Sequence, residues 1–422
     1  MHKYNLLLKE TLFYTVSKAI PGIVGLVSVI LFMRVFGSIQ YGEYSLFISQ
    51  CNLIVAIVFG WLNQSQLRYY SSDKKNSEYK RSQFRSLFLC FGASLIILSI
   101  LIIMQSFSIQ VWLISLLTII SIGIFNYIKT IYQAKLRPIN IIYMTSVQSF
   151  LGLLIPILLL FFGWTVGNTI LLGVLLSFTI VVLFIGLFSQ NKVFFEKNWS
   201  IKQNYNHLLI KKWFNYGGPI SIWLAVGLAL PFLDRFFINQ YLSSSNLGVY
   251  SGLQELLTRV YSLILFPIIL ALHPRIMNLW NSSNIYEATK LIKNGISIFL
   301  CFGIIIIFIV WNFFDSIFFI LQKAIPELGT HNKKLIIPLL SAGFLWQLSF
   351  LTHKMLELKE KTLIMLLAII PSLIVNIIGN SLFLPRFGEL ATASTAFISA
   401  LMYCTITFIY SIHNMIQIKN VK

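Results

Sequence analysis

Charged residues are scarce in this chain of 422 residues, and acidic residues are the scarcest. Only 11% of the residues are charged and 57% are hydrophobic, whereas soluble domains carry about 25% charged residues. The 13 acidic residues face 32 Lys and Arg, which leaves a formal net charge of +19. Because the bases lie in short runs between long apolar stretches, the pattern is typical of membrane proteins and excludes a soluble or nucleic-acid-binding protein.

Cysteine, proline and glycine are also sparse. The four cysteines lie in apolar segments without a CxxC pair, so we expect neither a disulfide framework nor a zinc site. The 11 Pro and 23 Gly exclude collagen-like repeats, and the apolar content excludes disorder. The GxxxxGK[ST], HExxH and GxSxG motifs are absent. We therefore expect no metal, no cofactor and no enzymatic activity.

Twelve apolar stretches are long enough to cross a bilayer, which takes about 20 residues of helix. The runs are continuous rather than alternating, so the sequence predicts an all-α membrane protein and not a β-barrel. The stretches cover approximately residues 11–35, 44–66, 86–106, 111–133, 141–162, 169–189, 214–238, 247–272, 291–312, 335–356, 363–384 and 391–412.

The basic residues predict the orientation of these spans. With the N-terminus placed in the cytoplasm, 24 of the 32 bases fall in cytoplasmic segments and six in outer segments, while Lys18 and Arg259 lie inside spans. Positive residues concentrate on the cytoplasmic side of membrane proteins. Both termini are therefore expected in the cytoplasm.

A weak internal repeat relates the first pair of spans to the seventh and eighth. Arg34-Val35-Phe36 and Gly42-Glu43-Tyr44-Ser45 correspond to Arg235-Phe236-Phe237 and Gly248-Val249-Tyr250-Ser251. The repeat predicts two six-helix lobes, 1–190 and 214–422, joined by a basic linker at 191–213. Since both lobes start in the cytoplasm, they would form a parallel repeat around a central cavity. Chance similarity between apolar segments is the alternative.

The eighth span contains the clearest candidate site. Glu255 and Arg259 lie on one polar face, and Arg259 is about 16–21 Å from either end of the span, too far for its side chain to reach the interface. Ionisable residues at this depth usually face a cavity or a partner. A neutral Glu255–Arg259 pair at i,i+4 spacing is the structural alternative.

Other polar residues within or near spans have open interpretations. Lys18 shares a face with Gly22 and Gly25 and either faces a cavity or extends to the cytoplasmic surface. Arg34 and Arg235 end their spans, so we expect each to anchor a helix end or to pair with a carboxylate. Asp234 follows Pro231 and either binds H⁺ or Na⁺ or pairs with Arg235.

Three polar residues of the eleventh span occupy one face. Ser372, Asn376 and Asn380 recur at i,i+4 spacing. Side chains of this kind hydrogen-bond between helices in membrane proteins. We therefore expect them to join neighbouring helices.

The chain resembles the polysaccharide-biosynthesis flippases of the multidrug/oligosaccharidyl-lipid/polysaccharide exporter superfamily. The resemblance rests on the twelve spans, on Arg34-x-Phe36-Gly37 with Tyr41-Gly42-x-Tyr44, and on Gly388-Glu389-Leu390-Ala391-Thr392-Ala393, which departs from the usual Gly-Ala-Ala form. It implies translocation of undecaprenyl-diphosphate-linked repeat units, for O-antigen or capsule, across the bacterial inner membrane. It also implies alternating access coupled to a gradient of H⁺ or Na⁺, and a polysaccharide polymerase and a chain-length regulator as partners.

A diphosphate needs cationic donors in a cavity of low dielectric constant. Arg259 and Lys18 are therefore the candidate substrate-binding residues, and Glu255 and Asp234 are the candidate ion-coupling residues. The alternatives are a multidrug/cation antiporter, a flippase for peptidoglycan precursors, and a membrane glycosyltransferase or acyltransferase.

Overall fold

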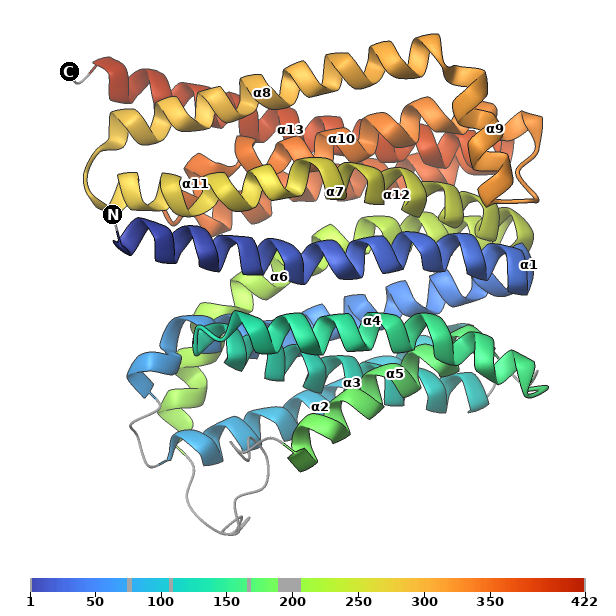
Figure 1. The fold of residues 1–422 in the computed structure, drawn as a ribbon, viewed down its shortest axis with the longest axis horizontal. Coiled ribbons are helices and arrows are strands. Elements are labelled where there is room, and N and C mark those ends of the chain that lie inside the picture. The colour runs from blue at the N-terminus through green and yellow to red at the C-terminus, as the bar shows by residue number, and fades with distance from the viewer. Residues whose placement is uncertain (1, 74–77, 106–108, 165–167, 189–205, 421–422) are drawn as a thin grey trace. The chain divides into compact units, whose positions relative to one another are not determined.

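The computed structural model describes residues 2–73, 78–105, 109–164, 168–188 and 206–420, and the regular elements in these ranges are all helices (Figure 1). They are α1 (His2–Asp73), α2 (Tyr79–Gln105), α3 (Ile109–Ala134), α4 (Pro138–Phe161), α5 (Thr169–Phe188), α6 (His207–Tyr241), α7 (Ser244–Asn281), α8 (Ile285–Asn312), α9 (Phe314–Ala324), the 3-10 helix η1 (Thr330–Leu335), α10 (Ile336–Thr352), α11 (Lys354–Leu358), α12 (Thr362–Phe387) and α13 (Glu389–Asn420).

The expected all-α membrane protein is confirmed. In the described ranges, ten helices are long and apolar enough to cross a membrane, and Thr169–Ile185 is a shorter apolar helix. The first of the ten, Lys18–Tyr70, covers most of the predicted span 11–35 and all of 44–66. The two are joined at Gly37, whose φ of 78° and ψ of 170° are readily adopted by glycine alone.

The described chain packs as two compact units. Unit 1 comprises Met1–Gly25 and Leu46–Phe232, and unit 2 comprises Leu26–Ser45 and Leu233–Lys422. These units divide the chain differently from the predicted lobes 1–190 and 214–422, because the chain passes between units within α1 and within α6. Most of the predicted linker 191–213 lies outside the described residues.

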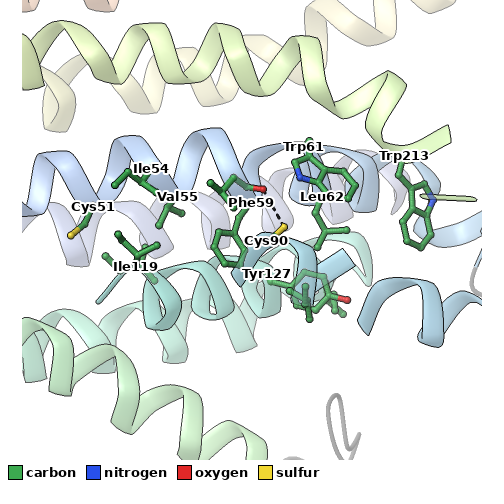
Figure 2. Close-up of a cluster of buried hydrophobic side chains, with 14 of the residues drawn as sticks. Cys51, Ile54, Val55, Phe59, Trp61, Leu62, Cys90, Ile119, Tyr127 and Trp213 are labelled. Carbon is green, nitrogen blue, oxygen red and sulfur yellow. Dashed lines mark hydrogen bonds between the residues drawn. The ribbon is translucent and has the colours of Figure 1, made fainter. Parts of the chain in front are cut away.

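The core of unit 1 forms where the second half of α1 packs on α2, α3 and the start of α6 (Figure 2). Phe59, Leu62 and Trp213 are fully buried there. At Gly123 of α3, a Cβ would lie 2.6 Å from the Phe59 ring, so glycine permits this close approach. Asp73, at the end of α1, accepts hydrogen bonds from Lys212 Nζ and Trp213 Nε1, both at 2.9 Å. These bonds join the start of α6 to the end of α1.

The core of unit 2 is built around α10, which contacts both α7 and α13. Leu265, Phe299, Leu351 and Met355 are each at most 1% exposed in this core. Their burial holds α7 in place, and α7 carries most of the predicted site.

Candidate functional site

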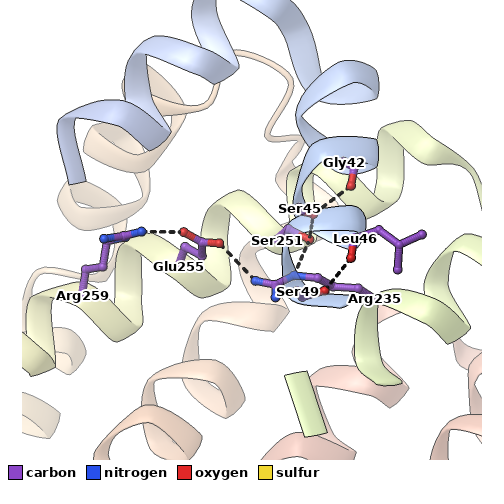
Figure 3. A network of polar contacts seen from close by, with 8 residues as sticks. All are labelled: Gly42, Ser45, Leu46, Ser49, Arg235, Ser251, Glu255 and Arg259. Atoms are coloured by element: carbon purple, nitrogen blue, oxygen red, sulfur yellow. Dashed lines mark hydrogen bonds and ion pairs between the residues drawn. The ribbon is translucent and has the colours of Figure 1, made fainter. Parts of the chain in front are cut away.

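Two arginines and one glutamate form a chain of ion pairs in unit 2 (Figure 3). Arg235 of α6 donates from Nη2 to Glu255 Oε1 at 3.2 Å, and Arg259 donates from Nη2 to Glu255 Oε2 at 3.0 Å. Glu255 and Arg259 lie one turn apart on α7, which gives the predicted i,i+4 pair. The sequence did not predict Arg235 as the third member.

The three side chains differ in exposure. Arg235 is 8% exposed, Glu255 22% and Arg259 34%. A guanidinium has five N–H donors, and the hydrogen bond of Arg259 to Glu255 uses one nitrogen. Within the described ranges, Arg259 Nε is buried without a hydrogen-bond partner. Arg259 therefore carries a positive charge, partly exposed, with donors left for an anionic ligand.

The buried end of this chain of ion pairs continues into a pair of serines. Arg235 Nε donates to Ser251 Oγ at 3.4 Å, and the Ser45 hydroxyl donates to the same Ser251 oxygen at 2.9 Å. Figure 3 shows these contacts as one network that extends from Gly42 and Ser45 to Arg259. Both serines are 0% exposed, so this end of the network is shielded from solvent.

The two copies of the weak repeat meet at this place. Ser45 and Ser251, which correspond in the repeat, contact each other, and so do Gly42 and Gly248. A Cβ at Gly42 would lie 2.8 Å from Gly248 N, and a Cβ at Gly248 would lie 1.9 Å from Ser38 O. The backbones thus approach at distances that allow only glycine. The repeat was predicted, but the contact between its copies was not.

Asp234 lies in a separate polar cluster of unit 2. It is 2% exposed and accepts hydrogen bonds from Asn376 Nδ2 (2.8 Å), Asn380 Nδ2 (3.2 Å) and the Tyr250 hydroxyl (3.3 Å). Asn376 and Asn380 therefore join α12 to α6, as the spacing of the eleventh span predicted. Within the described residues, the buried Asn380 Oδ1 and Ser372 Oγ have no hydrogen-bond partner.

Arg34 contacts a helix end in unit 2. Its Nε donates to the Lys323 carbonyl oxygen at 3.0 Å. Lys323 lies in the last turn of α9, where carbonyls have no partner within the helix. Arg235 differs, since α6 continues six residues beyond it to Tyr241 and its guanidinium contacts Glu255 and Ser251 instead of a helix end.

Lys18 belongs to unit 1 and is exposed on α1. Lys129 of α3, in the same unit, is close enough for the two positive charges to interact. Lys129 was not singled out from the sequence, because it was assigned to a cytoplasmic segment. Among the described residues, no three His, Cys, Asp or Glu side chains form a group that could hold a metal ion.

Solved structures share this fold along almost the whole chain. The lipid II flippase MurJ in an inward closed conformation aligns with a TM-score of 0.68 at 14% identity, over 95% of this chain and 87% of that chain. An inward-facing multidrug resistance MATE family transporter of the MOP superfamily aligns with a TM-score of 0.65 at 13% identity, over 97% of this chain and 96% of that chain. MATE in complex with MaD3S aligns with a TM-score of 0.63 at 13% identity, over 98% of this chain and 96% of that chain.

A family assignment comes from the sequence. No curated protein matches the chain, but the family model described as polysaccharide biosynthesis protein matches residues 7–280, more than half of the chain. The predicted family is therefore confirmed, and the solved structures that share the fold are those of transporters and a flippase. This chain belongs to the polysaccharide biosynthesis protein family and has the fold of the multidrug/oligosaccharidyl-lipid/polysaccharide exporters.

Proposed function

We propose that this protein is a flippase that moves undecaprenyl-diphosphate-linked oligosaccharide repeat units across the bacterial inner membrane by alternating access. The family match and the fold shared with MurJ support a lipid-linked substrate. The observation that carries the proposal is Arg259, a partly exposed guanidinium in the middle of a spanning helix. A diphosphate offers the matching anionic oxygens.

Arg259 binds the diphosphate through the donors that Glu255 leaves open. Guanidinium and phosphate match in geometry, and their hydrogen bonds gain strength where water is scarce. Lys18, with Lys129 nearby in unit 1, stays the second candidate for substrate binding.

Glu255 makes binding reversible. A phosphate that approaches Arg259 competes with the carboxylate for the guanidinium. If the pair opens, Glu255 keeps its second partner, Arg235, so the buried carboxylate is not left without a cation. Protonation of Glu255 would remove its negative charge and weaken its ion pairs with both arginines. The affinity of Arg259 for the substrate would therefore depend on the protonation of Glu255.

The contact between the repeat copies closes one side of the pathway. Gly42 against Gly248 and Ser45 against Ser251 form a tight contact that must separate for the opposite side to open. Arg235 bonds both to Ser251 and to Glu255, so substrate binding at Arg259 acts on this contact through three successive hydrogen bonds. This is how substrate would bias the two states of the transporter.

Asp234 is the proposed site for the coupling cation. Its carboxylate and the amide groups of Asn376 and Asn380 bring several oxygens together in a buried place. Rotation of the two amides by half a turn would direct their oxygens, instead of N–H groups, toward Asp234 and a cation such as Na⁺. A proton on Asp234 is the other candidate.

An exchange of Asp234 for asparagine tests the coupling. We expect Asp234→Asn to remain in the membrane but to lose the dependence of transport on a Na⁺ or H⁺ gradient. The control is Asp315→Asn, because Asp315 is 87% exposed and lies outside the cluster. An unchanged ion dependence in Asp234→Asn would remove Asp234 from the proposal.

The proposed setting is O-antigen or capsule assembly, with both termini in the cytoplasm. A polysaccharide polymerase and a chain-length regulator would act on the units after transfer. A strain that lacks the gene should accumulate lipid-linked repeat units accessible only from the cytoplasmic face. If such units instead reach the outer face at the wild-type rate, the flippase function is wrong.

A multidrug/cation antiporter is the second candidate, because MATE transporters align with almost the whole chain. A cavity for cationic drugs should offer carboxylates, whereas the more exposed member of the Glu255–Arg259 pair is the arginine, at 34% against 22%. Growth of the deletion strain in cationic dyes separates the candidates. Hypersensitivity to the dyes with normal surface glycan would favour the antiporter.

A further inference from the structure

An apolar cavity opens in unit 2, away from the ion pairs of Glu255. It has a volume of about 690 Å³ and is lined by residues of α7, α8, α10 and α13, together with Phe314 of α9. Apart from Tyr261, Gly303 and Ser341, the lining residues are aliphatic, Phe or Trp. Ligand pockets have volumes of roughly 300–1,000 Å³, so the cavity is large enough for a lipid chain.

On α8 the lining of the cavity ends at Gly303, where α8 touches α10. A Cβ at Gly303 would lie 2.6 Å from the Phe344 ring, so the two helices are in direct contact there. Toward Trp311 the lining of α8 becomes open, and Trp311 itself is 82% exposed. From Gly303 to Trp311 the helix rises by roughly 12 Å. This is close to half of a hydrocarbon core of about 30 Å, the depth of one leaflet.

The open end carries positive charge. Lys333 Nζ contacts Asp315, the residue after the lining residue Phe314, at 2.8 Å. Lys334 is exposed and precedes the lining residue Ile337 by three positions. Lys333 is ion-paired with Asp315, Lys334 interacts with Glu389, and both lysines place ammonium donors at this end. Tryptophan at a helix end is typical of the membrane–water interface. The charges thus lie where a lipid headgroup would be.

We propose that this cavity binds one acyl chain of an anionic phospholipid, whose phosphate contacts Lys333 and Lys334. The apolar wall, the depth of one leaflet and the cationic rim match the two parts of such a molecule. The polyprenyl chain of the proposed substrate is far longer than a cavity that ends at Gly303. The lipid is therefore a resident ligand that holds α8 against α10, and this inference does not depend on the flippase function.

Native mass spectrometry of the purified full chain in detergent tests the proposal, with phosphatidylglycerol and phosphatidylcholine added as mixed micelles. We expect one retained phosphatidylglycerol per protein and weaker retention of phosphatidylcholine. Ser341→Trp fills the cavity and should abolish retention, with size-exclusion chromatography as the check of folding. Lys333→Gln with Lys334→Gln should lower the preference for phosphatidylglycerol by about fivefold for each lysine.

The matched control is Lys290→Gln with Lys293→Gln, which removes two exposed lysines near the opposite end of α8. It should leave retention and preference unchanged. Absence of a stoichiometric lipid, equal retention of both lipids by the unaltered chain, or an undiminished preference after loss of Lys333 and Lys334 would overturn the proposal. So would displacement of phosphatidylglycerol by an equimolar polyprenyl diphosphate, which would assign the cavity to the substrate.

Discussion

Replacing Arg259 by glutamine removes the charge that the proposed diphosphate needs and changes little else. Glu255 keeps its bond to Arg235, and Arg259 is one-third exposed. Loss of such a partly exposed pair lowers the free energy of unfolding by less than about 1 kcal/mol. The protein should therefore remain folded in the membrane.

The effect on the substrate should be much larger. A hydrogen bond to a charged group contributes about 1.5–3 kcal/mol, so substrate affinity should fall roughly 10- to 150-fold. Arg259→Lys keeps the charge but loses the planar arrangement of donors, and it should lie between wild type and Arg259→Gln. The order of the three proteins is itself a test of phosphate recognition.

The assay is surface glycan in a deletion strain complemented by each variant, with membrane protein measured by immunoblot. Arg275→Gln is the control, because Arg275 is exposed and lies on the same helix, so an equal charge is removed at another place. Wild-type surface glycan in Arg259→Gln at equal protein level would refute the reasoning. An equal loss in Arg275→Gln would attribute the effect to net charge alone.

Three further predictions concern the contacts around Arg259. Arg235→Leu leaves the buried side of Glu255 without a cation and should lower the free energy of unfolding by about 3–5 kcal/mol, seen as a lower melting temperature in detergent than for Arg259→Gln. Gly248→Ala should destabilise the protein because its Cβ would lie 1.9 Å from Ser38 O. Gly92→Ala is the control and should melt at the wild-type temperature, because a Cβ at Gly92 has nothing within 4 Å. Equal melting temperatures of the two variants would contradict the close approach at Gly248. Cysteines at Ser45 and Ser251, in a background without native cysteines, should form a disulfide on oxidation, since the hydroxyl oxygens lie 2.9 Å apart. The oxidised protein should stop transport and the reduced protein should regain it, and transport by the oxidised form would argue against separation of this contact.

Hydropathy alone predicted most of the fold. Long apolar runs specify helices in a membrane because the backbone must satisfy its own hydrogen bonds there. The local pair of Glu255 and Arg259 could also be predicted from the sequence, because i,i+4 spacing places both on one face of a helix. The break between the first two spans was predicted as well, and Gly37, with its non-helical φ and ψ, lies between the two helices of α1.

Hydrogen-bond partners that are distant along the chain could not be predicted from the sequence. Asp234 has its asparagine partners 142 and 146 positions away. A pair with its neighbour Arg235 was one of the two interpretations that the sequence left open, yet the guanidinium of Arg235 bonds to Glu255. Adjacent residues of a helix project about 100° apart, so two neighbours reach different surroundings. A signal did exist in the polar face of Asn376 and Asn380, which required a polar partner on another helix.

Reconstitution of the purified protein in liposomes tests the central claim most directly. Lipid-linked oligosaccharide diphosphate is placed in the bilayer, and a membrane-impermeant lectin measures how fast the glycan appears on the opposite face. The account predicts transfer by the wild type that Arg259→Gln loses and Arg275→Gln retains. Liposomes with wild-type protein that transfer the glycan no faster than protein-free liposomes would contradict it.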